Sequence, residues 1–262
     1  MLESRLHYED GVYSIDQEDL EEKLADPQTS MLILCNPHNP VGKIWDRETL
    51  ERIGELCFKH HVLVLSDEIH CDITRPGMEY IPFASVSEHC KNNSITCVAP
   101  TKTFNLAGLQ TAAVIVPDAA LRHRVNRGLN TDEVAEPNVF AAIAPIAAFD
   151  RGREWLEELR EYLWENRKFA EDFIREEIPE LRTVSADATY LLWIDCNALP
   201  GDLSELAEFI RKESGLYVCD GREYGNGYGF LRMNLACRRE LLKEGLERLK
   251  RSIHSYRKGI SN

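Results

Sequence analysis

A chain of 262 residues can form one large domain or two smaller ones, and a hydrophobic content of 44% is sufficient for a buried core. The formal net charge of −13 argues against a general nucleic-acid or anionic-membrane binder. No apolar run approaches the roughly 20 residues that a membrane-spanning helix needs, and the first seven residues contain no apolar signal core.

The first half of the chain alternates predicted strands and helices. Residues 30–35 form a short apolar run, and the turn-rich segment 36–42 contains two X-Pro steps that exclude a helix. Asp46 then caps a predicted helix that extends to about His60, and residues 62–66 form the next strand. A strand–loop–helix–strand unit favours a parallel sheet with right-handed crossovers.

Two more strands are predicted at residues 94–98 and 111–116. Both are apolar runs, as expected of strands buried on both faces. The first half is therefore predicted to be an α/β domain with a mostly parallel sheet and helices on both faces.

The second half has a different pattern, which predicts a separate C-terminal α+β domain. We place the boundary near Arg153, so that the two domains comprise residues 1–152 and 153–262. The elements expected after Pro117 are helices at 118–130, 134–149, 155–178, 203–213 and 239–256, and strands at 189–195, 216–219 and 229–235.

Lys102 and Asp67 follow two neighbouring predicted strands, at the edge where open α/β sheets bind ligands. An amine and a carboxylate in these places can hold pyridoxal phosphate, the amine through a Schiff base and the carboxylate at the ring nitrogen. The alternatives are an exposed loop lysine for Lys102, and a helix cap or a surface ion pair for Asp67.

Asn39 and Arg232 are the other candidate binding residues. The amide of Asn39 could donate to a ring oxygen or a substrate carboxylate, or Asn39 could simply form a turn. Arg232 lies in an apolar predicted strand, where alternation places it on one face with Asn234. An arginine there needs a partner, which is either a ligand carboxylate or a structural ion pair.

Other features of the sequence point away from a metal site and towards a reducing compartment. His70, Cys71 and Asp72 are consecutive, so on a strand they would face alternate sides and form a poor chelate. We therefore expect no metal. No C-x-x-C pair occurs, which predicts reduced, mostly buried thiols in a cytoplasmic protein. The cysteines are Cys35, Cys57, Cys71, Cys90, Cys97, Cys196, Cys219 and Cys237.

In these segments the chain resembles aminotransferase class I/II proteins of the fold-type I pyridoxal-phosphate group. Within that group it is most similar to the C–S β-lyase branch, whose members resemble cystathionine β-lyase. The order and spacing of the segments agree along the whole chain. They are CNPHNPVG at 35–42, SDEIHCD at 66–72, TKTFNLAGL at 101–109, YLLWID at 190–195 and FLRMNLA at 230–236.

The resemblance implies a role for each matching residue. Lys102 would carry pyridoxal 5'-phosphate covalently, and Asp67 would pair with its ring nitrogen. Asn39 would contact the ring oxygen and the substrate carboxylate, which Arg232 would also hold. His70 would lie near the same ring oxygen, and Thr101 would contact the phosphate.

Two positions depart from the family pattern. Ala99 stands where many relatives have a phosphate-binding serine, and Gln110 stands where many have a phosphate-binding arginine. The lyase-like branch often lacks that arginine, so Gln110 supports the branch assignment. Both changes imply weaker phosphate binding from this side.

The resemblance implies a lyase that releases pyruvate, ammonia and a thiol from a sulfur-containing amino acid such as cystathionine or a cysteine conjugate. An aminotransferase is the first alternative, and a truncated remnant that acts as a binding or scaffold protein is the second. Relatives carry roughly another third of a chain before the point that matches Met1. We therefore expect a truncated chain with weak cofactor binding, which forms a homodimer or associates with the missing part.

Overall fold

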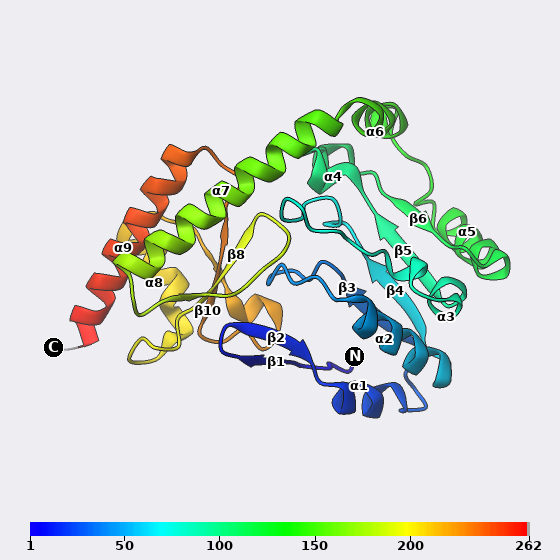
Figure 1. Cartoon of the computed structure of the whole chain (residues 1–262), viewed down its shortest axis with the longest axis horizontal. Coiled ribbons are helices and arrows are strands. Elements are labelled where there is room, and N and C mark those ends of the chain that lie inside the picture. Colours follow the sequence, from blue (N-terminus) through cyan, green and yellow to red (C-terminus); the bar gives the residue numbers. More distant parts are fainter. Residues whose placement is uncertain (261–262) are drawn as a thin grey trace. The chain divides into compact units, whose positions relative to one another are not determined.

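The computed structural model describes residues 1–260, and its contacts group the chain into two compact units (Figure 1). Unit 1 comprises residues 1–5, 15–38 and 43–160. Unit 2 comprises residues 6–14, residues 39–42 and the chain from Glu161. The sequence predicts a single boundary near residue 153. In the structure, two short segments from the first half of the chain instead group with the C-terminal half. The assignment of the units as cofactor-binding and small domains stays a prediction.

Unit 1 contains a four-stranded sheet in the order β3-β4-β5-β6. Strands β3 (Met31–Cys35), β4 (Leu63–Asp67) and β5 (Ser94–Val98) are parallel, and β6 (Ala113–Ile115) pairs antiparallel with β5. The expected mostly parallel α/β sheet is confirmed. The register places Cys35, Asp67 and Cys97 side by side at its carboxyl-terminal edge.

Helix α2 (Arg47–Lys59) begins at the predicted cap, where Asp46 accepts a hydrogen bond from the Thr49 N–H at 2.8 Å. Its apolar stripe, spaced three or four residues apart, is buried and includes Leu50, Ile53 and Leu56. Helices α1 (Gln17–Leu24) and α3 (Glu88–Asn92) were not predicted. In α1 the available signal was the Asp16 cap followed by Leu20 and Leu24.

The remaining helices of unit 1 follow β5. One-turn helix α4 (Pro100–Thr103) precedes β6, and α5 (Ala119–Thr131) follows it. Helix α6 (Phe140–Arg151) begins six residues later than expected and exposes about two thirds of Phe140, Ile143 and Ile146. Short 3-10 turns occur at Phe83–Ser85 and Ala107–Leu109.

Unit 2 contains an antiparallel sheet in the order β7-β8-β10-β9. The strands are β7 (Arg182–Thr183), β8 (Leu191–Asp195), β9 (Cys219–Asp220) and β10 (Phe230–Asn234). The strand expected at 216–219 is shorter and begins at Cys219. Together with the helices around it, this sheet forms the expected α+β arrangement.

The two faces of this sheet have different partners. One face carries Leu192, Ile194 and Leu231, which belong to the main core of the unit together with residues of the long helices. These helices are α7 (Arg153–Glu177), α8 (Leu206–Ser214) and α9 (Arg239–Ile260). Among the described residues, none of the helices has the length and apolar composition needed to cross a membrane.

The other face of the sheet carries an aromatic cluster that the hairpin β1 (Leu6–Glu9)–β2 (Val12–Ile15) helps to cover. Trp193 stacks on Phe230 with ring centroids 5.2 Å apart, and Tyr8 meets Phe230 edge-on at 5.2 Å. The Tyr8 hydroxyl donates to Asp195 at 2.9 Å. This cluster explains why residues 6–14 group with unit 2.

Backbone contacts attach the loop 39–42 to unit 2. The Gly42 carbonyl accepts hydrogen bonds from the N–H groups of Asp187 and Ala188, both at 2.9 Å. Gly42 has a φ of +79°, and a Cβ there would lie 2.4 Å from the Ala188 oxygen. Only glycine fits this position without strain.

A buried polar network connects the ends of β3 and β4 in unit 1. Glu68 is 2% exposed and accepts hydrogen bonds from the Ser66 hydroxyl at 2.9 Å and the Phe83 N–H at 3.0 Å. The Tyr80 hydroxyl donates to the Asn36 carbonyl at 2.9 Å, and the Asn36 N–H donates to the Asp67 carbonyl at 3.0 Å. Burial raises the pKa of Glu68 above its ordinary value.

We expect Gly42→Ala to destabilise the protein by about 1–3 kcal/mol, because the new Cβ collides with the Ala188 carbonyl and the φ is positive. Gly128→Ala is the matched control, since Gly128 lies in α5 and a Cβ there would meet none of the described residues within 4 Å. The control should stabilise the helix by up to about 1 kcal/mol. Urea unfolding measures both, and equal midpoints would contradict the proposed strain.

We expect the contribution of Glu68 to stability to fall as pH rises above the ordinary Glu pKa, because folding raises the pKa of Glu68. The folded state then binds a proton on Glu68 that the unfolded state has lost, so this contribution decreases until pH passes the raised value. Glu68→Gln should weaken this dependence in urea unfolding across a pH series. Glu22→Gln, at an exposed position, should leave it intact. A Glu68→Gln profile parallel to wild type would contradict the raised pKa.

Candidate functional site

Lys102 and Asp67 lie in unit 1 beyond the ends of adjacent strands. Asp67 is the last residue of β4, and Lys102 lies in α4, the single turn that follows β5. Because β4 and β5 are parallel, with Asp67 opposite Cys97, both residues are at the carboxyl-terminal edge of the sheet. The pairing therefore brings to one edge an amine and a carboxylate that are 35 positions apart in the sequence.

Both groups are half-buried and retain bonding capacity. The hydrogen bond to the Asp67 carboxylate comes from the Ile69 N–H, at 3.2 Å. Within residues 1–259, the Lys102 amine makes no hydrogen bond or ion pair. A carboxylate can accept several hydrogen bonds, so Asp67 can still accept one from a protonated ring nitrogen.

His70 and Thr101 accompany these two residues in unit 1. His70 is 3% exposed and lies in the turn after β4, where its carbonyl accepts a hydrogen bond from the Ile73 N–H at 3.1 Å. Thr101 is half-buried in α4, next to Lys102. The four unit 1 candidates thus come from two segments that follow neighbouring strands.

Asn39 and Arg232 lie in unit 2, where they are in direct contact. The Arg232 Nη1 group donates to the Asn39 Oδ1 atom at 3.2 Å. Arg232 lies in β10 opposite Trp193, on the face of the aromatic cluster, and Asn234 lies on the same face as expected. The Gly42 backbone contacts hold the loop that carries Asn39 in this unit.

The half-buried Arg232 side chain is surrounded by neutral groups. Its Nη2 group lies 3.3 Å from the Cys219 sulfur, and its guanidinium lies over the Tyr224 ring, 4.6 Å from the centroid. It forms no ion pair with the described residues 1–259. A guanidinium has five N–H donors, so several remain available to bind a carboxylate through two hydrogen bonds.

Tyr224 and Cys219 were missed by sequence reasoning. They lie 8 and 13 positions before Arg232, in a 3-10 turn and in the short strand β9. The available signal was that aromatic rings are suitable neighbours for a half-buried arginine. Nothing in the spacing, however, indicated which of the nearby tyrosines would be that neighbour.

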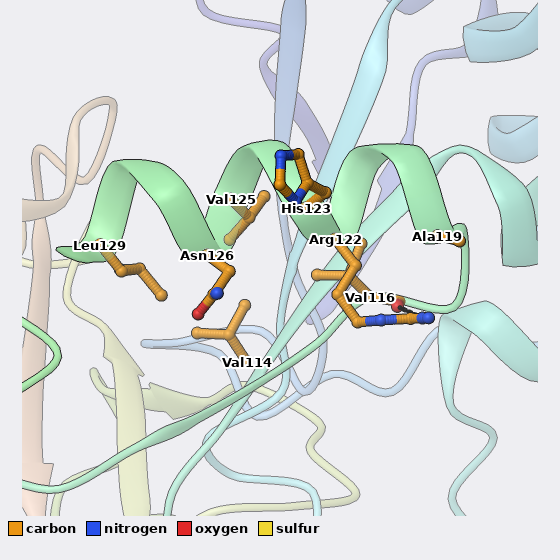
Figure 2. A pocket seen from close by; sticks show the side chains of 8 residues that line it. All are labelled: Val114, Val116, Ala119, Arg122, His123, Val125, Asn126 and Leu129. Carbon is orange, nitrogen blue, oxygen red and sulfur yellow. Dashed lines mark hydrogen bonds between the residues drawn. The ribbon is translucent and has the colours of Figure 1, made fainter. Parts of the chain in front are cut away.

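A cavity of about 460 Å³ in unit 1 lies away from these candidates. Figure 2 shows Val114 and Val116 on one side of it and Asn126 and Leu129 of α5 on the other. Arg122 also lines the cavity, and its guanidinium already donates to the backbone carbonyls of Val116 and Pro117, both at 2.8 Å. None of the residues expected to take part in chemistry lines this cavity.

The pattern of the family described as aminotransferase class I and II matches residues 5–249. The cystathionine beta-lyase PatB of Bacillus subtilis is 42% identical over 254 residues, which cover 97% of this chain and 66% of PatB. The chain thus spans slightly less than two thirds of this curated relative.

Solved structures agree with this family. Cystalysin from Treponema denticola, a structure that contains pyridoxal 5'-phosphate, is 31% identical with a TM-score of 0.90, covering 97% of this chain and 65% of its own. A pyridoxal-phosphate-bound C–S lyase from Staphylococcus hominis is 32% identical with a TM-score of 0.86, covering 95% and 64%. The match in sequence and in fold leads to one conclusion: this chain belongs to the aminotransferase class I and II family.

Proposed function

We propose that this chain is the part of a pyridoxal-phosphate-dependent C–S β-lyase that carries the reactive lysine. The observation that carries the proposal is the placement of Lys102 and Asp67 at the ends of adjacent parallel strands, each without an ion pair among the described residues. Similarity to the cystathionine beta-lyase PatB and to the C–S lyase structure from Staphylococcus hominis supports the lyase branch.

The residues present fit the cofactor. Lys102 supplies an unpaired amine for covalent attachment, and Asp67 supplies a carboxylate with free acceptor capacity for the ring nitrogen. Asn39 and His70 would contact the ring oxygen, and Thr101 would contact the phosphate. When bound, pyridoxal phosphate acts as an electron sink for charge that develops on the substrate Cα.

Each protein residue would have a defined role towards the substrate. Arg232 and Asn39 would bind the α-carboxylate, because the neutral surroundings of Arg232 leave its charge uncompensated. The amine of Lys102 would remove the proton from Cα, since an uncharged amine positioned next to Cα can act as a general base.

The proposed overall reaction cleaves the Cβ–S bond of a sulfur-containing amino acid. The sulfur leaves as a thiol, and one water molecule is consumed as the remaining fragment becomes pyruvate and ammonia. An aminotransferase would instead transfer the amino group to a keto acid and leave the C–S bond intact. Assaying thiol and pyruvate together distinguishes the two.

A homodimer, or association with a further part of the family fold, stays a prediction. A cytoplasmic location also stays a prediction.

We expect pyridoxal phosphate followed by borohydride to label Lys102 covalently, since reduction fixes an amine–aldehyde conjugate. Peptide mass spectrometry locates the label, and Lys102→Ala should abolish it. Lys212→Ala, at an exposed position, is the matched control and should leave labelling intact. Labelling spread evenly over surface lysines would contradict the proposed function.

We expect Arg232→Gln to raise the cystathionine concentration needed for half-maximal thiol release by ten- to hundredfold, because a charge-assisted hydrogen bond contributes about 1.5–3 kcal/mol. The exposed Arg238→Gln variant is the control and should behave as wild type. An unchanged concentration dependence in Arg232→Gln would remove Arg232 from the carboxylate site.

A further inference from the structure

Helix α4, which carries Lys102, is a single turn of four residues. A helix this short has no stability of its own, because nucleation fixes several dihedral angles for one hydrogen bond. The Lys102 side chain makes no hydrogen bond or ion pair within residues 1–259. Contacts made by its neighbours must therefore fix its position.

Thr103, the next residue, makes such a contact. Its side chain is fully buried, and its hydroxyl donates to the Asp72 Oδ2 atom at 2.9 Å. Asp72 belongs to the segment that starts at Asp67. Two backbone hydrogen bonds shape that segment, from Cys71 N–H to the Glu68 carbonyl at 3.0 Å and from Ile73 N–H to the His70 carbonyl at 3.1 Å.

This hydrogen bond connects two segments that separate where the sheet ends. The last backbone link between them runs from the Glu68 N–H to the Cys97 carbonyl, at 2.9 Å. Asp72 is five residues beyond the end of β4, and Thr103 is five residues beyond the end of β5. The side-chain contact thus ties the Lys102 segment to the Asp67 segment beyond the sheet.

Phe104 holds the other end of α4. Its ring meets Phe149 edge-on at 5.3 Å and stacks on Trp155 at 5.9 Å. A Cβ on Gly152 would lie 2.5 Å from the Phe104 ring, so the close approach requires glycine there. These contacts attach α4 to α6 and α7, whereas Thr103 attaches it to the segment of Asp67.

We propose that Thr103 and Asp72 are positioning residues that set the placement of Lys102 relative to Asp67. This inference rests on the proposed function. Both residues would act through the segments that they join. The Lys102 amine must reach the aldehyde of pyridoxal phosphate while the Asp67 carboxylate meets its ring nitrogen. This requires a defined separation of the amine and the carboxylate, and small misplacements of either are costly.

The test compares Thr103→Val, which keeps the shape and removes the hydroxyl, with Thr103→Ser, which keeps the hydroxyl. One readout needs no cofactor: hydrogen exchange of the Phe104 and Leu106 amides, which donate to the carbonyls of Pro100 and Thr101. The other is the fraction of bound pyridoxal phosphate that borohydride fixes on Lys102, counted per folded molecule.

We expect Thr103→Val to accelerate exchange at both amides and to lower the fixed fraction about fivefold to tenfold, the effect of one lost partly buried hydrogen bond. Thr103→Ser should match wild type in both readouts. If Thr103→Val does not fold, the acceptor of the hydrogen bond is changed instead. Asp72→Asn keeps an acceptor oxygen and Asp72→Ala removes it, so these two variants give the same comparison.

The outcomes separate the two proposals. If borohydride fixes the same fraction of pyridoxal phosphate on Lys102 in wild type as in Thr103→Val or Asp72→Ala, the positioning role is overturned. The proposed function would still stand. A lower unfolding midpoint with an unchanged fixed fraction would also overturn the positioning role, because the contact would then be merely structural. Absence of label on Lys102 in wild type would overturn the proposed function and this inference with it.

Discussion

Parallel hydrogen bonding between β3, β4 and β5 is the constraint on which the candidate site in unit 1 depends. Parallel strands end at the same edge of a sheet, so the chain must leave that edge three times within a small region. The register that aligns Cys35, Asp67 and Cys97 determines which residues follow each strand there. A slip of one residue would turn Asp67 to the opposite face of the sheet.

Buried polar contacts support this edge from within unit 1. Glu68, Tyr80 and Asn36 hold the segments after β3 and β4, and Thr103 and Asp72 hold the segments after β4 and β5. Such contacts are specific, because a buried polar atom that loses its partner destabilises the fold. These contacts connect the segments around the candidate site to one another, while Lys102 and Asp67 keep their own bonding capacity.

In unit 2, the positively charged Arg232 side chain lies among neutral groups. Its guanidinium contacts Asn39, Cys219 and Tyr224, none of which neutralises its charge. A structural arginine usually has a carboxylate partner, as the buried Arg167 has in Glu171 at 3.4 Å. The contrast between these two arginines within one unit supports an anionic ligand for Arg232.

The sequence by itself determined the strands β3, β4, β5, β8 and β10, the Asp46 cap and the candidate residues, because apolar periodicity, capping chemistry and family motifs are local signals. Only the tertiary structure decided that residues 6–14 and 39–42 group with unit 2, since aromatic packing of Tyr8 and the close approach at Gly42 join distant segments. The partners of Arg232 and of Thr103 were likewise undetermined. Side-chain contacts between segments leave no periodic trace in a single sequence, because they depend on the geometry with which the strands and loops meet.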